Sequence, residues 1–387
     1  MINNGEAKSI EPKKQVGSPL INVTRTDLPP IDKYIYYLRK IWANCWLTND
    51  GEFVQLLRRK LEDYLKVKNL VLMSNGTLTL HTALKAFGIK GEVITTPFTF
   101  AATTNVLLWE GLTPVFADID PTTYNIDPID VEKKITNKTT AILPVHVYGN
   151  PCYVNHLQEI ADKHNLKIIY DAAHAFGVEY ENQPITDFGD ASTLSFHATK
   201  VFNTIEGGAV VAKEEKIFET LILMRNHGIK SEEEVVLPGT NAKMSEFQAA
   251  MGLCNLETVE GAIGRRRLLY EHYVEELSRL SGIKFQKIIS SKYNYSYMPV
   301  CFESKEKRDK IYSVLLKHQI KSRKYFFPLT VDFDYFKGNK DDLVNEYRLI
   351  NSCKISNGIL CLPIYPDLTI PEVDKIISFL KGTLANC

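Results

Sequence analysis

The chain has 387 residues and carries 46 basic and 46 acidic side chains, so its formal net charge is zero. This length exceeds one typical domain, and the neutral balance does not indicate the extended basic face that nucleic-acid binding requires. Seven scattered cysteines form no CxxC pair. They predict reduced thiols in a cytoplasmic protein, and they argue against a disulfide framework, a zinc site and an iron–sulfur cluster.

The N-terminal region is polar before it becomes helical. Residues 1–17 lack an apolar h-region and predict a flexible tail instead of a signal peptide. No apolar run in the chain approaches the ~20 residues of a membrane span. Residues 29–51 predict a helix that ends in a turn, and Thr48 and Asn49 in this turn are candidate sugar contacts.

From about residue 70, short apolar runs alternate with helical segments. This alternation predicts an α/β sheet that is mostly parallel, with ligands bound at the carboxyl ends of its strands. The expected strands lie at 69–73, 92–97, 113–120, 139–149, 166–173, 192–196 and 208–213.

After Lys243 the pattern changes to a long helical stretch, 244–280. We expect it to connect the sheet to a smaller unit with a strand at 295–302 and helices at 305–318 and 371–382. The predicted organisation is a large domain over 18–260 and a small C-terminal α/β domain over 261–387.

Several common nucleotide and hydrolase motifs are absent from the sequence. It contains no GxxxxGK[ST], no GxGxxG and no GxSxG. A Walker-type NTPase, a dinucleotide-binding Rossmann domain and an α/β-hydrolase are therefore disfavoured.

The segment SNGT (74–77) follows the first expected strand and opens a helix. Free N–H groups at a helix N-terminus suit a phosphate, so Gly76 and Thr77 are candidate phosphate contacts. An ordinary helix cap is the simpler interpretation of this segment when it is taken alone.

Asp171 ends the strand expected at 166–173. A carboxylate at the end of an apolar strand needs a partner. It could cap the next helix, or it could face a cationic ligand atom such as a protonated pyridine nitrogen. His174, three residues later, could be a core histidine or a contact to such a ring.

Lys200 follows the strand expected at 192–196, which includes Ser195. A lysine is a nucleophile only when its amine is deprotonated, and its established covalent use is an imine with an aldehyde, including that of pyridoxal phosphate (PLP). A surface charge is the simpler interpretation of an isolated lysine. Together, however, a phosphate cup, a strand-end aspartate and a later lysine are the three fixtures that PLP requires.

Six motifs occur in the order found in a known family. The chain resembles the sugar aminotransferases of the DegT/DnrJ/EryC1/StrS family, which have PLP fold type I, from about residue 20 to the C-terminus. The motifs are SNGTLTLHTAL, TTPFTFAATTN, PVFADID, YDAAHAFG, LSFHATKVFNTIEGGAVV and GTNAKMSEFQAA.

The resemblance implies a role for individual residues. Lys200 matches the imine-forming lysine, Asp171 the partner of the pyridine nitrogen, and Phe100 the aromatic ring that stacks on the cofactor. Phosphate contacts are implied for Gly76, Thr77 and Ser195. His174 stands near the ring hydroxyl, where many relatives have glutamine.

The resemblance also implies a homodimer, because Asn241 matches an asparagine that reaches the phosphate in the neighbouring subunit. The lysine is present at position 200, whereas relatives with histidine there are dehydratases, so transamination from L-glutamate is favoured. No metal is implied.

Within the family, the motifs and YGNPC (148–152) are most similar to enzymes that aminate C4 of dTDP-4-keto-6-deoxyglucose for surface glycans such as the O-antigen. Amination of the 3-keto isomer at C3 is an alternative, and so is a non-catalytic regulator that binds PLP or a sugar nucleotide. Arg323 and Tyr325 are candidate contacts to the diphosphate, since a guanidinium suits phosphate geometry.

Overall fold

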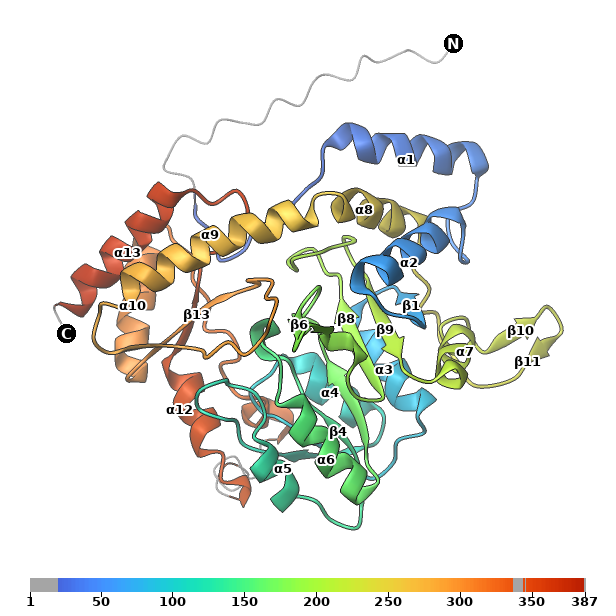
Figure 1. Ribbon diagram of the computed structural model, residues 1–387, viewed down its shortest axis with the longest axis horizontal. Coiled ribbons are helices and arrows are strands. Elements are labelled where there is room, and N and C mark those ends of the chain that lie inside the picture. The colour runs from blue at the N-terminus through green and yellow to red at the C-terminus, as the bar shows by residue number, and fades with distance from the viewer. Residues whose placement is uncertain (1–19, 337–343, 345, 386–387) are drawn as a thin grey trace.

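The computed structural model describes residues 20–336, 344 and 346–385. Its centre is a seven-stranded sheet enclosed by helices, and a smaller three-stranded sheet lies beside it (Figure 1). The tail predicted for residues 1–17 lies outside the described residues.

The large sheet is mixed but mostly parallel, as the sequence predicts. Its strand order is β1-β9-β8-β5-β4-β2-β3, and β9 alone runs against the direction of the other six. The strands are Leu70–Met73 (β1), Glu92–Thr95 (β2), Thr113–Phe116 (β3), Thr139–Leu143 (β4), Lys167–Asp171 (β5), Ala191–Ser195 (β8) and Gly208–Ala212 (β9).

Both faces of the sheet are covered by helices, which explains why its strands are continuous apolar runs. In β1, Leu70 and Leu72 belong to one core cluster, and Val71 and Met73 belong to the other, because successive side chains point to opposite faces. Glu52–Leu65 (α2), Val154–His164 (α6) and Glu246–Leu256 (α8) pack on the first face, and Gly76–Ala86 (α3), Ala101–Trp109 (α4) and Glu215–Met224 (α7) pack on the second.

The helical stretch predicted over 244–280 is divided into α8 and Val259–Leu277 (α9). The break follows Asn255, whose side-chain amide donates a hydrogen bond to the Asn203 carbonyl at 2.9 Å. The carbonyl of Asn255 accepts from both the N–H and the hydroxyl of Thr258. These contacts turn the chain from the sheet toward the C-terminal elements.

The C-terminal part contains an antiparallel sheet of Ile283–Phe285 (β12), Met298–Phe302 (β13) and Ile359–Leu362 (β14). Its helices are Lys305–Lys317 (α10), Ile350–Gly358 (α12) and Ile370–Leu384 (α13). Helix α9 continues across position 260, so the domain boundary predicted there stays a prediction.

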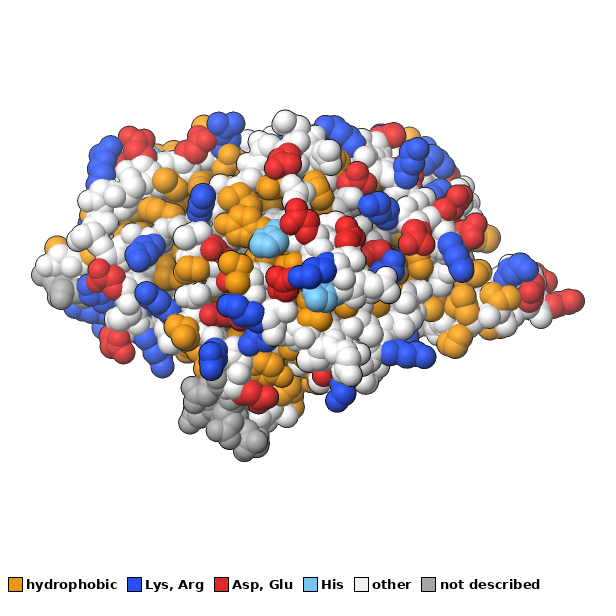
Figure 2. Space-filling view, turned by 60° about the horizontal axis from the view of Figure 1, so that its bottom comes forward, with side chains coloured by type: hydrophobic (Ala, Val, Ile, Leu, Met, Phe, Trp, Pro, Cys, Tyr) orange, Lys and Arg blue, Asp and Glu red, His pale blue; other side chains and the backbone are white. Residues whose placement is uncertain are grey.

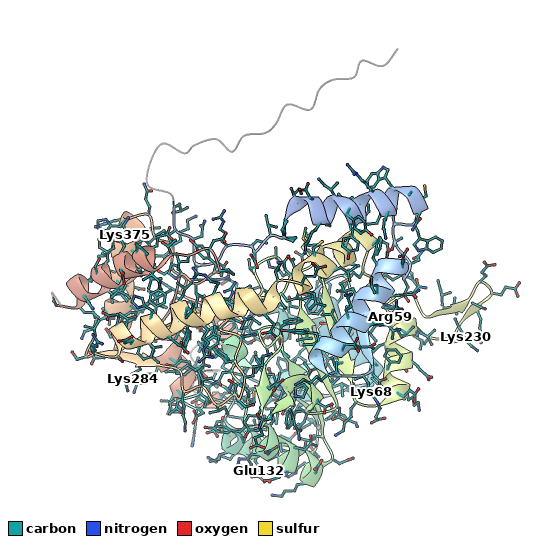
Figure 3. The ribbon with its side chains drawn as sticks, turned by 45° about the horizontal axis from the view of Figure 1, so that its top comes forward. Arg59, Lys68, Glu132, Lys230, Lys284 and Lys375 are labelled. Carbon is teal, nitrogen blue, oxygen red and sulfur yellow. The ribbon has the colours of Figure 1, made fainter. Side chains whose placement is uncertain are left out.

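The remaining elements complete the fold. They are α1 (Ile31–Asn44), α5 (Pro128–Lys133), the strand pair β6 (Glu179–Tyr180) and β7 (Gln183–Pro184), the pair β10 (Ile229–Ser231) and β11 (Glu234–Val235), and the 3-10 turns Val147–Gly149, Ile185–Asp187, Thr330–Asp332 and Asp334–Phe336. The β10–β11 hairpin, which carries Lys230, projects from the body of the molecule (Figure 3).

The surface shown in Figure 2 carries interspersed acidic and basic side chains. Within the described ranges, no helix combines the length and apolar character needed to cross a membrane. The six cysteines in those ranges are free thiols, and no cluster of His, Cys, Asp or Glu there is arranged to hold a metal ion.

Candidate active site

A cavity of about 690 Å³ opens at the carboxyl ends of the parallel strands. Its volume falls in the range of small-molecule sites. Segments that follow β1, β2, β4, β5 and β8 converge on it, together with a C-terminal segment. Nine of the predicted site residues line it: Gly76, Thr77, Phe100, Asp171, His174, Ser195, Lys200, Arg323 and Tyr325.

The N-terminus of α3 forms one wall of the cavity. The Asn75 side chain caps this helix by accepting a hydrogen bond from the Leu78 N–H at 2.9 Å. The cap leaves the N–H groups of Gly76 and Thr77 without partners inside the helix. A Cβ atom on Gly76 would lie 2.7 Å from the Cβ of Ser195, so only glycine lets the turn approach the Ser195 hydroxyl. This arrangement is a cup of donors suited to a phosphate.

Phe100 immediately precedes α4 and lies at the edge of the cavity. It is 50% exposed, although the two residues before it, Phe98 and Thr99, are buried. An aromatic face left open inside a cavity can stack on a flat ring.

Asp171 is the last residue of β5 and is only 6% exposed. Its Oδ2 accepts a hydrogen bond from the Thr103 hydroxyl at 2.8 Å, and its Oδ1 accepts from the Ala173 N–H at 3.1 Å. Burial raises the pKa of Asp171, while these two hydrogen bonds and the Lys200 charge oppose the increase. The carboxylate can therefore be stabilised further by a cationic group in the cavity.

Lys200 lies in the turn after β8, where its N–H donates to the His197 carbonyl. Protein atoms surround its side chain, yet part of the side chain remains accessible from the cavity. This burial lowers the pKa of Lys200 to about 8; the Asp171 carboxylate raises it and the Arg323 charge lowers it further. An amine with this pKa is neutral often enough near neutral pH to act as a nucleophile or a base.

His174 is buried in an aromatic cluster. Its ring is nearly parallel to that of Phe326, with the centroids 5.9 Å apart, and Nε2 lies 3.3 Å from the Tyr325 hydroxyl and 3.4 Å from the Tyr297 hydroxyl. Burial holds the pKa of His174 well below its usual range, so the imidazole is neutral. Nδ1 is buried and has no hydrogen-bond partner among the described residues.

The segment that carries Arg323 and Tyr325 is fixed by a backbone pair with Cys361. The Arg323 guanidinium lies over the Tyr325 ring, 4.1 Å from its centroid. Arg323 itself is exposed, so it presents a positive charge to a ligand that enters the cavity.

Three predicted site residues lie outside this cavity. Asn241 is exposed, and its side-chain oxygen accepts a hydrogen bond from Lys243 at 3.0 Å. Thr48 and Asn49 lie in the exposed turn that follows α1. The fold of one chain does not bring these residues to Lys200.

The sequence pattern does not single out Thr103, Tyr297 and Phe326. Thr103 lies in the motif TTPFTFAATTN, and its position four residues after Thr99 at a helix start is the one signal for it. Tyr297 and Phe326 had no comparable signal, because they reach His174 only through the packing of the C-terminal part on the large sheet.

The cavity fits pyridoxal phosphate. The donor cup at α3 matches its phosphate, the open face of Phe100 its ring, the buried Asp171 its pyridine nitrogen and Lys200 its aldehyde. No other grouping of the predicted residues combines these four features in the described chain.

Comparison with known proteins agrees with this geometry. The profile of the DegT/DnrJ/EryC1/StrS aminotransferase family matches residues 31–381. The chain is 42% identical to a dTDP-4-amino-4,6-dideoxy-D-glucose transaminase of Escherichia coli, over 94% of this chain and 99% of that protein.

Solved structures show the same fold. DesI, determined in the presence of its TDP-sugar product, has a TM-score of 0.87 and 31% identity, covering 95% of this chain and 94% of its own. NtdA from Bacillus subtilis, with bound cofactor PMP, has a TM-score of 0.85 and 26% identity, covering 92% and 82%. The predicted fold type and cofactor are confirmed: the chain belongs to the DegT/DnrJ/EryC1/StrS aminotransferase family and uses pyridoxal phosphate.

Proposed function

We propose that this enzyme transfers the amino group of L-glutamate to dTDP-4-keto-6-deoxyglucose and forms dTDP-4-amino-4,6-dideoxyglucose. The observation that carries the proposal is one cavity that joins a lysine with a lowered pKa, a buried carboxylate and a phosphate cup. The choice of sugar is supported by the 42% identity to the E. coli transaminase of that name.

Pyridoxal phosphate, when bound, supplies an electron sink for the carbanion that forms at the amino carbon. Asp171 holds the proton on the pyridine nitrogen, which maintains that sink. The first turn of α3 and the Ser195 hydroxyl bind the phosphate, and Phe100 packs on the ring and fixes its plane.

Lys200 is the attachment point for the aldehyde and, once released, the acid–base group. Its Nζ would take the proton from Cα of glutamate and give it to C4′ of the cofactor. With the keto sugar it would take that proton back and give it to the carbon that receives the nitrogen. The pKa of about 8 supports both roles, because neutral and charged forms are both populated near neutral pH.

Arg323 and Tyr325 are proposed to bind the sugar diphosphate. Both line the cavity, and the stacked guanidinium offers paired N–H donors with a fixed orientation. His174 also lines the cavity and is proposed to lie near the ring hydroxyl of the cofactor.

A homodimer is part of the proposal. The side chains of Trp42, Trp46 and Leu47 are 67%, 56% and 49% exposed on and just after α1, which lies at the rim of the molecule (Figure 3). Such exposed apolar side chains favour a protein interface. A second copy would cover them and bring Asn241, and with it Thr48 and Asn49, to the neighbouring cavity. The cytoplasmic location stays a prediction.

The decisive experiment supplies glutamate and dTDP-4-keto-6-deoxyglucose to the purified enzyme and identifies the product by NMR. We expect nitrogen on C4, and we expect the visible band of the bound cofactor to disappear in Lys200→Ala. If only the 3-keto isomer is aminated, the sugar assignment is wrong. If glutamate leaves the band unchanged, the enzyme is not a transaminase of this donor.

A further inference from the structure

The Thr103 hydroxyl lies next to Asp171, on the face of the sheet that α4 covers. Thr103 is fully buried in the first turn of α4, and its Oγ1 lies 2.8 Å from Asp171 Oδ2. The other carboxylate oxygen accepts from the Ala173 N–H. Because each oxygen has its own donor, the carboxylate is held in one orientation.

The hydroxyl chain continues to Thr99, whose Oγ1 lies 2.8 Å from that of Thr103. A hydroxyl has one hydrogen to donate, and an ionised carboxylate can only accept. Thr103 therefore donates to Asp171, and Thr99 donates to Thr103. While Asp171 is ionised, both of its oxygens can only accept, so this direction is fixed, and each bond polarises the next.

Asp171 needs these hydrogen bonds because the Lys200 charge, which also favours the ionised carboxylate, is not constant. Burial disfavours the ionised carboxylate. Three groups oppose this effect: the Thr103 hydroxyl, the Ala173 N–H and the Lys200 charge. Lys200 loses its charge whenever its amine is deprotonated, and burial lowers its pKa to about 8. Thr103 and the Ala173 backbone are then the protein groups that remain to keep Asp171 ionised.

We propose that Thr103 is a positioning residue that keeps Asp171 ionised and oriented, and so keeps the proton on the pyridine nitrogen of the cofactor. This inference rests on the proposed role of Asp171. Thr103 touches neither the reacting atoms nor the cavity surface, and it acts through the carboxylate.

The chain offers a matched control one position away. Thr104 lies on the same helix and is equally buried, but its hydroxyl has no hydrogen-bond partner among the described residues. Thr103→Val and Thr104→Val therefore make the same chemical change in the same helix, and only the first removes a hydrogen bond to Asp171. Thr103→Ser keeps the hydroxyl and should behave as the wild type does.

The measurement is the ¹⁵N NMR shift of ring-labelled PLP in the holoenzyme between pH 6 and 9. A hydrogen bond to a charged group is worth enough to shift the proton equilibrium between nitrogen and carboxylate by about ten-fold. We expect Thr103→Val to shift this proton equilibrium about ten-fold toward Asp171. We also expect it to lower kcat more than it changes the KM for glutamate. Thr104→Val and Thr103→Ser should leave the shift unchanged.

Equal ¹⁵N shifts in Thr103→Val and Thr104→Val, with a protonated ring in the wild type, would overturn the inference and leave the proposed function intact. An unprotonated ring in the wild-type enzyme would instead overturn the role of Asp171, and the inference with it. If Thr103→Val does not fold, Thr103→Cys decides the question, because a thiol of similar size is a weak donor.

Discussion

The lowered pKa of Lys200 leads to the most direct test of the site. At the ordinary lysine pKa of 10.5, about 0.03% of the amine is neutral at pH 7, whereas at a pKa of about 8 about 9% is neutral. The cavity therefore raises the reactive fraction roughly 300-fold. This gain comes from burial, and two charges with opposite effects modify it.

The perturbations are Asp171→Asn and Arg323→Gln, which remove one charge each and keep the side chain at a similar size. Asp171 raises the pKa of Lys200 and Arg323 lowers it. Asp171→Asn should therefore lower the pKa further, and Arg323→Gln should raise it toward the ordinary value. Opposite signs are the diagnostic feature, since a general loosening of the cavity would move both variants toward 10.5.

The assay is competitive acetylation of the apoenzyme with acetic anhydride, with the modified Lys200 peptide quantified by mass spectrometry as a function of pH. The midpoint of the labelling curve gives the pKa, and lysine in a short peptide provides the reference. We expect a midpoint near 8 in the wild type. A midpoint above 10, or a shift of both variants in the same direction, would refute the electrostatic account of this site.

Two further predictions concern the phosphate cup and the dimer. Gly76→Ala places a Cβ atom 2.7 Å from Ser195 Cβ, so we expect a loss of about 1–3 kcal/mol in stability and weaker PLP binding in a fluorescence titration. In the control Gly264→Ala, the new Cβ lies inside α9 and has no neighbour within 4 Å, so PLP binding should be unchanged and stability should rise by about 0.5–1 kcal/mol. Mixing inactive Lys200→Ala and Asn241→Ala proteins should restore activity if Asn241 acts across the dimer, because each heterodimer then has one complete site. Absence of recovery in verified heterodimers would contradict the proposed role of Asn241.

Much of the large sheet could be predicted from the sequence, because its strands are buried on both faces. Each is a short apolar run bounded by turn residues, and this pattern needs no knowledge of distant contacts. The strand expected at 139–149 was too long, since apolar residues continue into the 3-10 turn Val147–Gly149. The break between α8 and α9 was not visible, because it depends on the contact of Asn255 with the distant Asn203.

The candidate site also has residues that the sequence predicts and residues that only tertiary contacts bring into place. Asp171 ends a strand, and Gly76 and Lys200 come three and five residues after the end of one. The carboxyl ends of parallel strands meet at one edge of a sheet, so local pattern and chain order were sufficient to place these residues together. The sequence by itself thus determined the fold class, the cofactor chemistry and the family.

Only the tertiary structure decided how those groups are tuned. The pKa of Lys200 depends on burial and on Arg323, which is 123 positions away. The hydrogen bond that opposes the raised pKa of Asp171 comes from Thr103, which is 68 positions away in α4. The neutral state of His174 depends on a cluster completed by Tyr297, Tyr325 and Phe326. Desolvation and hydrogen bonding act over a few ångströms in space, and the linear order of residues does not contain those distances.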